Sequence, residues 1–135
     1  MLKLVVGLKG SGKTKELIDL VNKSADETNG SVVCLEKGHK LMHEINYKTR
    51  LVDTEEYGVN NAESLYGMVV GMFASNHDIT HIFIDSALKI CNNDLTEFEK
   101  FVLKADAFGK SNGVELFFTS SVALEELSEN LKKYL

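Results

Sequence analysis

The sequence predicts an α/β fold: a three-layer α/β/α sandwich with a mainly parallel five-stranded sheet. Two observations predict it. Short β-type runs alternate with segments of helical periodicity along the whole chain, as in parallel sheets whose crossover helices cover both faces. The run His81–Ile84 is also too densely apolar for an edge strand and suits a strand buried on both faces. With 135 residues, the chain is expected to form a single domain, residues 1–135.

The first half of the chain is predicted to contain three strands and two helices. Leu2–Val6 is a short β-type run that leads through a glycine-rich loop into a helix over Lys15–Asn22. Ser31–Leu35 and Arg50–Val52 are two further β-type runs. Asn61–Ser75 repeats apolar residues at the spacing of a helix with one buried face.

The second half is predicted to supply two more strands and two more helices: strand His81–Ile84, a helix from Asp94 to Gly109, strand Val114–Phe118 and a terminal helix over Val122–Lys133. Asp94 precedes Glu97 by three residues, an arrangement typical of a helix N-terminus. Gly109 is the expected end of that helix, because glycine favours helix C-terminal positions. The terminal helix is predicted from three leucines: Leu124, Leu127 and Leu131.

Composition and charge argue against several classes of function. The net charge of −5 argues against a broad nucleic-acid-binding surface. The longest apolar stretch, Leu65–Ala74, is too short for a membrane span, and the chain starts at once with a predicted core strand, so neither a span nor a signal peptide is expected. Cys34 and Cys91 form no C-x-x-C pair, which favours a reducing, cytoplasmic location.

The segment from Gly7 to Thr14 reads G-L-K-G-S-G-K-T and fits the phosphate-binding pattern G-x-x-x-x-G-K-[ST] at every fixed position. Glycines let such a loop turn its N–H groups inward toward phosphate oxygens. Lys13 is expected to contact the β- and γ-phosphates, Thr14 to ligate Mg²⁺, and the following helix to add its positive N-terminal end. The predicted nucleotide-binding residues are Gly7, Leu8, Lys9, Gly10, Ser11, Gly12, Lys13, Thr14 and Lys15.

A predicted strand precedes this motif and a predicted helix follows it, as the motif requires, whereas chance would place the pattern in roughly 0.5% of chains of this length. The chain therefore resembles the P-loop nucleoside triphosphatases. This resemblance implies a minimal P-loop NTPase core, a single nucleotide-binding domain over residues 1–135, and ATP and Mg²⁺ as ligands.

Asp85 ends the run H-I-F-I-D, which resembles the Walker B strand of P-loop proteins. The resemblance implies that Asp85 supports the Mg²⁺ opposite the Thr14 hydroxyl. The alternative is a carboxylate that caps the turn after the strand. In one large branch of the superfamily a glutamate follows this aspartate and polarises the attacking water, whereas this chain has Ser86.

Glu36 is the candidate to replace that glutamate. It ends V-V-C-L-E, which resembles the second strand of RecA-type ATPases, whose terminal glutamate orients water. The competing interpretation is a solvated acidic residue in a loop with Lys37 and Lys40. Weaker candidates for the same task are Asp53, Glu55 and Glu56.

Thr119 lies at the end of a strand that reads F-F-T-S. The RecA-type resemblance implies that a polar residue here contacts the γ-phosphate, although Ser121 or a neighbour could instead cap the last helix. Arg50 is the only arginine, so a positive charge that stabilises the transition state would come from Arg50, a lysine or a partner. His39 and His43 lie four residues apart and are interpreted as a surface pair rather than metal ligands.

The leading functional hypothesis is a Mg-ATP-binding protein with slow or partner-stimulated ATP hydrolysis, acting as a switch or ATPase component of an assembly. ATP is favoured over GTP because no guanine-reading N-K-x-D follows a late strand. An unknown protein partner or a homo-oligomer is expected. The short length and the opening motif are similar to stand-alone bacterial P-loop proteins that are labelled twitching-motility (PilT-like) ATPases.

Two alternatives remain open. The first is a non-catalytic nucleotide-binding regulator, which Ser86 and the single arginine favour. The second is a small-molecule kinase acting on a nucleoside or nucleotide, because phosphoryl transfer needs no water-activating glutamate.

Overall fold

The five strands form one sheet in which every neighbouring pair is parallel, in the order β1-β5-β4-β2-β3. The structure is a computed structural model that describes residues 1–135. The strands are β1 (Leu2–Gly7), β2 (Ser31–Glu36), β3 (Arg50–Asp53), β4 (Ile79–Ile84) and β5 (Glu115–Ser121). The predicted α/β class and five strands are confirmed, and β1 and β3 lie at the two edges of the sheet.

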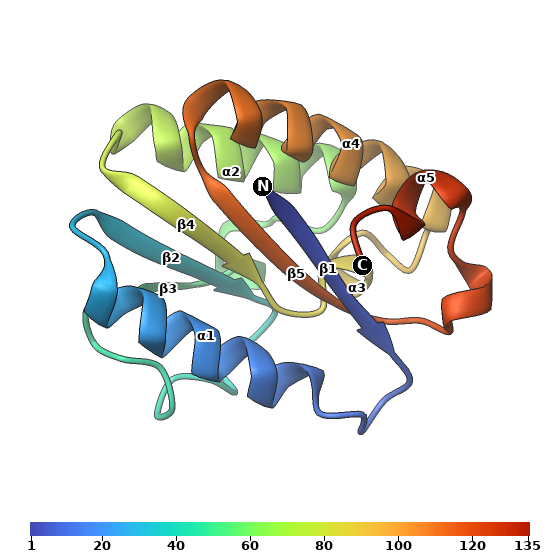
Figure 1. Ribbon diagram of the computed structural model, residues 1–135, viewed down its shortest axis with the longest axis horizontal. Helices are drawn as coiled ribbons and strands as arrows, with labels where there is room; N and C mark the ends of the chain where they lie inside the picture. The colour runs from blue at the N-terminus through green and yellow to red at the C-terminus, as the bar shows by residue number, and fades with distance from the viewer.

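Helices cover both faces of the sheet, which confirms the three-layer sandwich. Figure 1 shows α1 (Lys13–Glu27) on one face, and α2 (Ala62–Ser75) and α4 (Leu95–Asn112) together on the other. Two helices are short, α3 (Ala87–Ile90) and α5 (Glu129–Lys132), and 3₁₀ turns lie at Glu55–Tyr57 and Leu124–Glu126. None of the helices combines the length and the apolar character that crossing a membrane requires.

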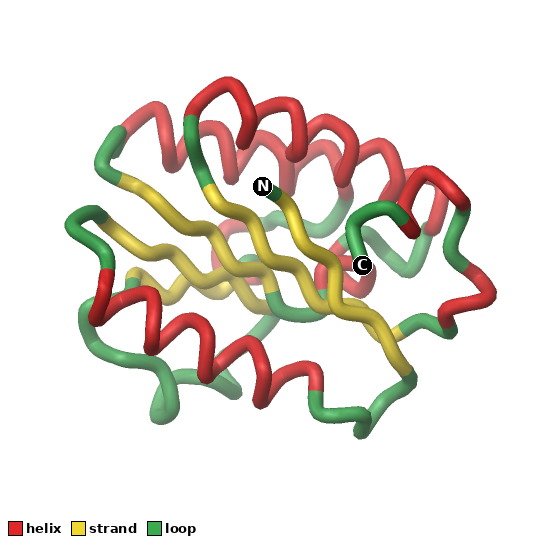
Figure 2. The backbone as a smooth tube through the Cα atoms, viewed as in Figure 1, coloured by secondary structure: helices red, strands yellow, loops and turns green.

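The two faces of the sheet are covered unequally. The cluster of buried apolar residues on the α2 and α4 side has 27 members, whereas the cluster beneath α1 has 8. The loop of residues 37–49 adds to the cover on the α1 side (Figure 2), where Asn22 of α1 bonds the backbone of Glu44 and Asn46 at 2.9 and 2.7 Å. One helix and one loop therefore cover this face of the sheet, whereas several helices cover the opposite face.

The predicted helix end at Gly109 is wrong. Helix α4 continues to Asn112, and Gly113 ends it with φ 68°, a left-handed conformation that glycine adopts without strain. Gly109 has a different task, because a Cβ at this position would lie 2.9 Å from the carbonyl oxygen of Val114. The predicted start is confirmed, since the Asp94 side chain accepts a hydrogen bond from the Glu97 N–H at 3.1 Å.

The continuous helix predicted over Val122–Lys133 is also wrong. Val122 is held in extended backbone, because its N–H donates to the carbonyl of Gly7 at 3.2 Å. A 3₁₀ turn follows, and α5 comprises Glu129–Lys132 alone. The three leucines do not share one buried stripe, because Leu124 is 49% exposed whereas Leu127 and Leu131 are buried.

The C-terminal residues are tied to the edge of the sheet and to α4. The Leu4 N–H donates to the carbonyl of Tyr134 at 2.8 Å, and the Tyr134 hydroxyl donates to the buried Asp106 carboxylate at 2.8 Å. Burial alone would raise the pKa of Asp106, but the hydrogen bonds from Tyr134 and Lys110 outweigh burial and lower it. Asp106 is therefore a buried charge that depends on its donors.

We expect Tyr134→Phe to lower the free energy of unfolding by about 2 kcal/mol, because it removes a hydrogen bond to a buried carboxylate. Urea denaturation of the variant and the wild type measures the difference. Tyr57→Phe is the matched control: Tyr57 is 57% exposed, so its change should stay below about 0.5 kcal/mol. Equal small losses in both variants would contradict an anchoring role for Tyr134.

Candidate functional site

The residues that end the parallel strands lie at one edge of the sheet. Strand register places Glu36 opposite Asp53, and the pairs Leu35–Ile84 and Ile84–Phe118 bring Asp85 between Glu36 and Thr119. The sequence-predicted residues Glu36, Asp85 and Thr119 are thus neighbours. The loop that follows β1 reaches the same edge and completes the candidate site.

The segment from Gly7 to Thr14 joins β1 directly to α1. Gly10 and Gly12 both have φ 88°, a backbone conformation that residues with a Cβ rarely adopt. Gly7 meets a different constraint, because a Cβ there would lie 2.6 Å from Ser11 Oγ. Helix α1 begins without a side-chain cap at Gly12, so its first backbone N–H groups remain available to a ligand.

Lys13 is the first residue of α1, and its side chain folds back along the loop. Its Nζ donates to the Leu8 carbonyl at 3.0 Å and to Ser11 Oγ at 3.3 Å. The residue is largely buried. The ammonium group is therefore held within the curve of the loop by two neutral oxygens and no carboxylate.

Asp85 connects the loop to the centre of the sheet. Its Oδ1 accepts hydrogen bonds from Thr14 Oγ1 at 3.3 Å and from Thr119 Oγ1 at 2.7 Å. The Thr119 hydroxyl in turn accepts the Ser86 N–H at 2.8 Å. Thr119 is 1% exposed and lies beneath Asp85, so its hydroxyl fixes the carboxylate and the turn that follows it.

A pocket of about 620 Å³ opens above these residues. Five lysines and one carboxylate line it, whereas the chain as a whole carries a net charge of −5. The lining residues are Lys9, Gly10, Gly12, Lys13, Thr14, Lys15, Lys40, Leu41, Asp85, Ser86, Lys89, Asn93 and Ser121. This cluster of lysines attracts anions into an otherwise acidic molecule.

Most of the sequence-predicted residues reach this pocket. Lys9, Gly10, Gly12, Lys13, Thr14, Lys15 and Asp85 line it, whereas Gly7, Leu8, Ser11, Glu36 and Thr119 are not among the lining residues. Arg50 begins β3, where it pairs with Val33 in the middle of β2, and it does not line the pocket. The positively charged side chains that this chain places in the pocket are therefore all lysines.

The sequence predictions missed several lining residues, above all Lys40, Lys89 and Asn93. Lys89 and Asn93 follow Asp85 through an unpredicted turn in which Ser86, Asn92 and Asn93 all have positive φ. Asparagine tolerates that conformation better than most residues, so the pair Asn92–Asn93 was a usable signal for a tight turn. Lys40 carried no such signal, because it lies within the 37–49 loop.

Glu36 is buried, with 3% of its surface exposed, and its Oε2 accepts the Leu41 N–H at 3.0 Å. Burial raises the pKa of Glu36, and the nearby carboxylates of Asp85 and Asp53 add to the rise; the N–H groups of Leu41 and Lys40 oppose it. Its carboxylate does not line the pocket. Leu41, which lines the pocket and bonds Glu36 through its N–H, therefore connects the predicted base to the wall of the pocket.

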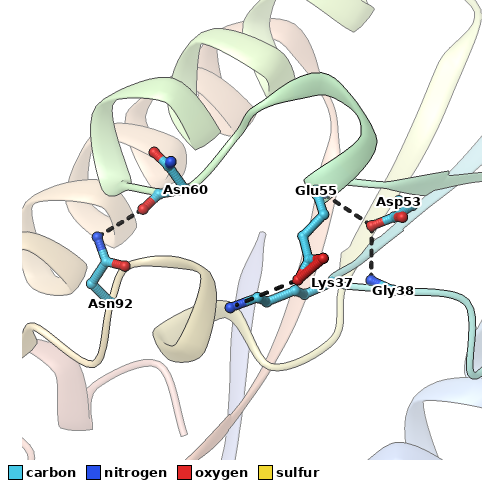
Figure 3. A network of polar contacts seen from close by, with 6 residues as sticks. All are labelled: Lys37, Gly38, Asp53, Glu55, Asn60 and Asn92. Atoms are coloured by element: carbon cyan, nitrogen blue, oxygen red, sulfur yellow. Dashed lines mark hydrogen bonds and ion pairs between the residues drawn. The ribbon is translucent and has the colours of Figure 1, made fainter.

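Asp53, which lies opposite Glu36 in strand register, bonds the segments that carry Gly38 and Glu55, as Figure 3 shows. Its Oδ1 accepts the N–H groups of Gly38 at 2.8 Å and Glu55 at 2.9 Å, and His39 Nε2 lies 3.2 Å from its Oδ2. The N–H bonds from Gly38 and Glu55, with the nearby charge of His39, lower the pKa of Asp53 against the effect of burial. Asp53 thus holds the segments on either side of it, and Glu55 pairs with Lys37 at 3.9 Å.

The histidines form no metal centre. His39 pairs with Asp53, and no group of three or more histidine, cysteine, aspartate and glutamate side chains is arranged to hold a metal ion. The oxygens of Thr14 and Asp85 lie 3.3 Å apart at the carboxyl edge of the sheet.

We expect Glu36→Gln to raise the melting temperature relative to the wild type by more at pH 8 than at pH 4. The pKa of Glu36 is higher in the folded protein than in the unfolded chain, where it is near 4.5. Protonated Glu36 therefore stabilises the folded protein below the unfolded pKa, and this stabilisation is lost as the pH rises through the folded pKa. Glutamine does not titrate, so the difference between the variants should grow with pH. Parallel melting curves from pH 4 to 8 measure it; a difference independent of pH would contradict the raised pKa.

Two comparisons with known proteins complete the description of the site. A scan of the sequence against protein-family models gives no match, and a search of the curated proteins gives none either. Lys13, Thr14 and Asp85, brought together by the fold, therefore carry the functional proposal.

Proposed function

We propose that this chain binds a Mg-nucleoside triphosphate, ATP before GTP, in the lysine-lined pocket, and hydrolyses it slowly or when a partner stimulates it. The observation that carries the proposal is the contact between Thr14 and Asp85. Their side chains lie 3.3 Å apart although 71 residues separate them in the sequence. The hydroxyl of the glycine-loop motif and the aspartate that ends an apolar strand thus meet where the motif chemistry needs them.

The phosphates would lie in the curve of the Gly7–Thr14 loop. The uncapped first turn of α1 supplies backbone N–H groups and the positive end of the helix dipole. The Lys13 ammonium would exchange the Leu8 carbonyl and Ser11 hydroxyl for β- and γ-phosphate oxygens. That exchange replaces two neutral acceptors with charged ones, so it favours the bound complex.

The donor set at this position fits Mg²⁺. Thr14 and Asp85 offer a hydroxyl and a carboxylate, the oxygen ligands that Mg²⁺ takes, and one or two protein ligands plus phosphates are its usual complement in nucleotide sites. The ion, when bound, neutralises charge on the phosphate oxygens. The Thr119 hydroxyl donates to Asp85 and holds this carboxylate in place. The predicted effect of Thr119 on the γ-phosphate would therefore be exerted through Asp85.

Glu36 remains the predicted water-orienting base. Its raised pKa moves it toward the range that suits a general base near neutral pH. Its bond to the Leu41 N–H would have to open before the carboxylate could contact a water molecule in the pocket. A partner that shifts residues 37–41 would supply that step, which agrees with slow unassisted turnover.

Both cysteines are free and buried, which supports the proposed cytoplasmic location.

A second candidate function is a nucleotide-binding regulator that does not hydrolyse its ligand. The observation that favours it concerns the two positions at which a water-activating base could lie, the residue after Asp85 and the end of β2. Ser86 replaces the glutamate expected after Asp85, with its N–H bound to Thr119, and Glu36 is buried behind Leu41.

About 1 mM Mg-ATP should raise the melting temperature of the wild type by about 8–12 °C if the dissociation constant is about 10 μM, which corresponds to about 2.7 kcal/mol. Lys13→Ala should lose this rise. Lys23→Ala, at an exposed position of α1 away from the loop, should keep it. Thermal melts with and without ligand measure each shift; no shift in the wild type would contradict nucleotide binding.

We expect Glu36→Gln to bind ATP as the wild type does and to lower its turnover about 100-fold, the lower end of a general base's contribution. Phosphate release under single-turnover conditions measures the rate. Glu63→Gln is the control, since Glu63 is exposed in the first turn of α2 and forms no ion pair. An unchanged rate in Glu36→Gln would exclude Glu36 as the base, and binding with no hydrolysis in the wild type would favour the regulator.

A further inference from the structure

The lining of the pocket differs from that of most small-molecule sites. Such sites are mainly apolar, with a few polar groups that orient the ligand. Here Leu41 is the one hydrophobic residue among the 13 that line the pocket, and five are lysines. The pocket therefore offers charge for phosphates and very little apolar surface for a nucleobase.

The positive charge in the pocket is not neutralised by the chain itself. None of its five lysines lies within 4.0 Å of a carboxylate oxygen, although Asp85 lines the same pocket. Elsewhere in the chain, five lysines form ion pairs: Lys37, Lys48, Lys100, Lys110 and Lys132. The difference leaves a concentrated, unpaired positive charge at the carboxyl edge of the sheet.

The two lysines that face the loop stand on fixed backbone. Lys40 precedes Leu41, whose N–H is bound by the buried Glu36 carboxylate. Lys89 belongs to α3, where the Leu88 N–H donates to the buried Ser120 hydroxyl at 3.2 Å and both Leu88 and Ile90 are buried. Their ammonium groups can move, but their points of attachment on the far side of the pocket are set.

We infer that this pocket recognises the phosphate chain of its ligand and leaves the base in solvent, so that a linear condensed phosphate such as tripolyphosphate binds it in competition with ATP. This inference rests on the proposed nucleotide site and specifies which part of the ligand is bound. A triphosphate carries several negative charges along one chain, and lysines on both sides of the pocket can contact them together. Preference between ATP and GTP is then small.

The test is isothermal titration of the full chain with Mg-ATP, Mg-GTP and Mg-tripolyphosphate at one free Mg²⁺ concentration. We expect the dissociation constant of tripolyphosphate within tenfold of that of ATP, and those of ATP and GTP within fivefold of each other. Lys40→Gln and Lys89→Gln should each weaken ATP and tripolyphosphate by the same factor, about two- to fivefold for an exposed charge. Lys23→Gln, an exposed lysine outside the pocket and in no ion pair, is the matched control.

The outcomes separate the inference from the proposed function. Binding of ATP with tripolyphosphate more than tenfold weaker would overturn the inference and keep the nucleotide site. If Lys40→Gln and Lys89→Gln weakened the binding of ATP but not that of tripolyphosphate, the inference would also be overturned, because the lysines would then contact another part of the nucleotide. Binding of tripolyphosphate without either nucleotide would support the phosphate pocket and overturn the proposed function, and binding of none of the three would overturn both.

Discussion

The hydrogen bonds of the Asp85 carboxylate are the contacts on which the site depends. Strand β5 separates β1 from β4 in the sheet, so the strand that leads into the glycine loop and the strand that leads into Asp85 are not direct neighbours. Thr119, at the end of the intervening strand, bonds Asp85 from below, and Thr14 at the start of α1 bonds it from the side. Three segments thus meet at one carboxylate, and a small shift of any of them changes the mouth of the pocket.

Electrostatics divides the carboxyl edge of the sheet into two zones. Three carboxylates, Asp53, Glu36 and Asp85, lie at the ends of neighbouring strands, and burial, together with repulsion by the other two carboxylates, raises the pKa of Glu36. The lysines of the pocket lie on the solvent side of this row. Asp53 bonds backbone N–H groups and His39, and Glu36 bonds the Leu41 N–H, so neither forms an ion pair with a lysine of the pocket. An acidic chain thereby keeps one strongly positive surface.

Local pattern predicted the strands, the long helices and the loop because each depends on residues close in sequence. Predictions failed where distant contacts decide: the approach of Val114 requires Gly109 within a helix, and the bond to Gly7 holds Val122 extended. At the site, motif spacing identified Lys13, Thr14 and Asp85, which line the pocket. Lys40 and Lys89 belong to no motif, because the turns that bring them there follow from tertiary packing. The same limit applies to Glu36, whose cover by Leu41 no spacing encodes.

The position of β1 at the edge of the sheet also bears on the order in which the molecule is assembled. Its single strand partner is β5, so that Leu2 pairs with Leu116, while β2, β3 and β4 pair among themselves in the middle of the sequence. Closing so long a segment costs more chain entropy than the local pairings do, and contacts of large sequence separation slow folding. During synthesis, β1 cannot pair until β5 has been made. The glycine loop that follows β1 is therefore exposed on the nascent chain, without a completed pocket, while β2, β3 and β4 are synthesised.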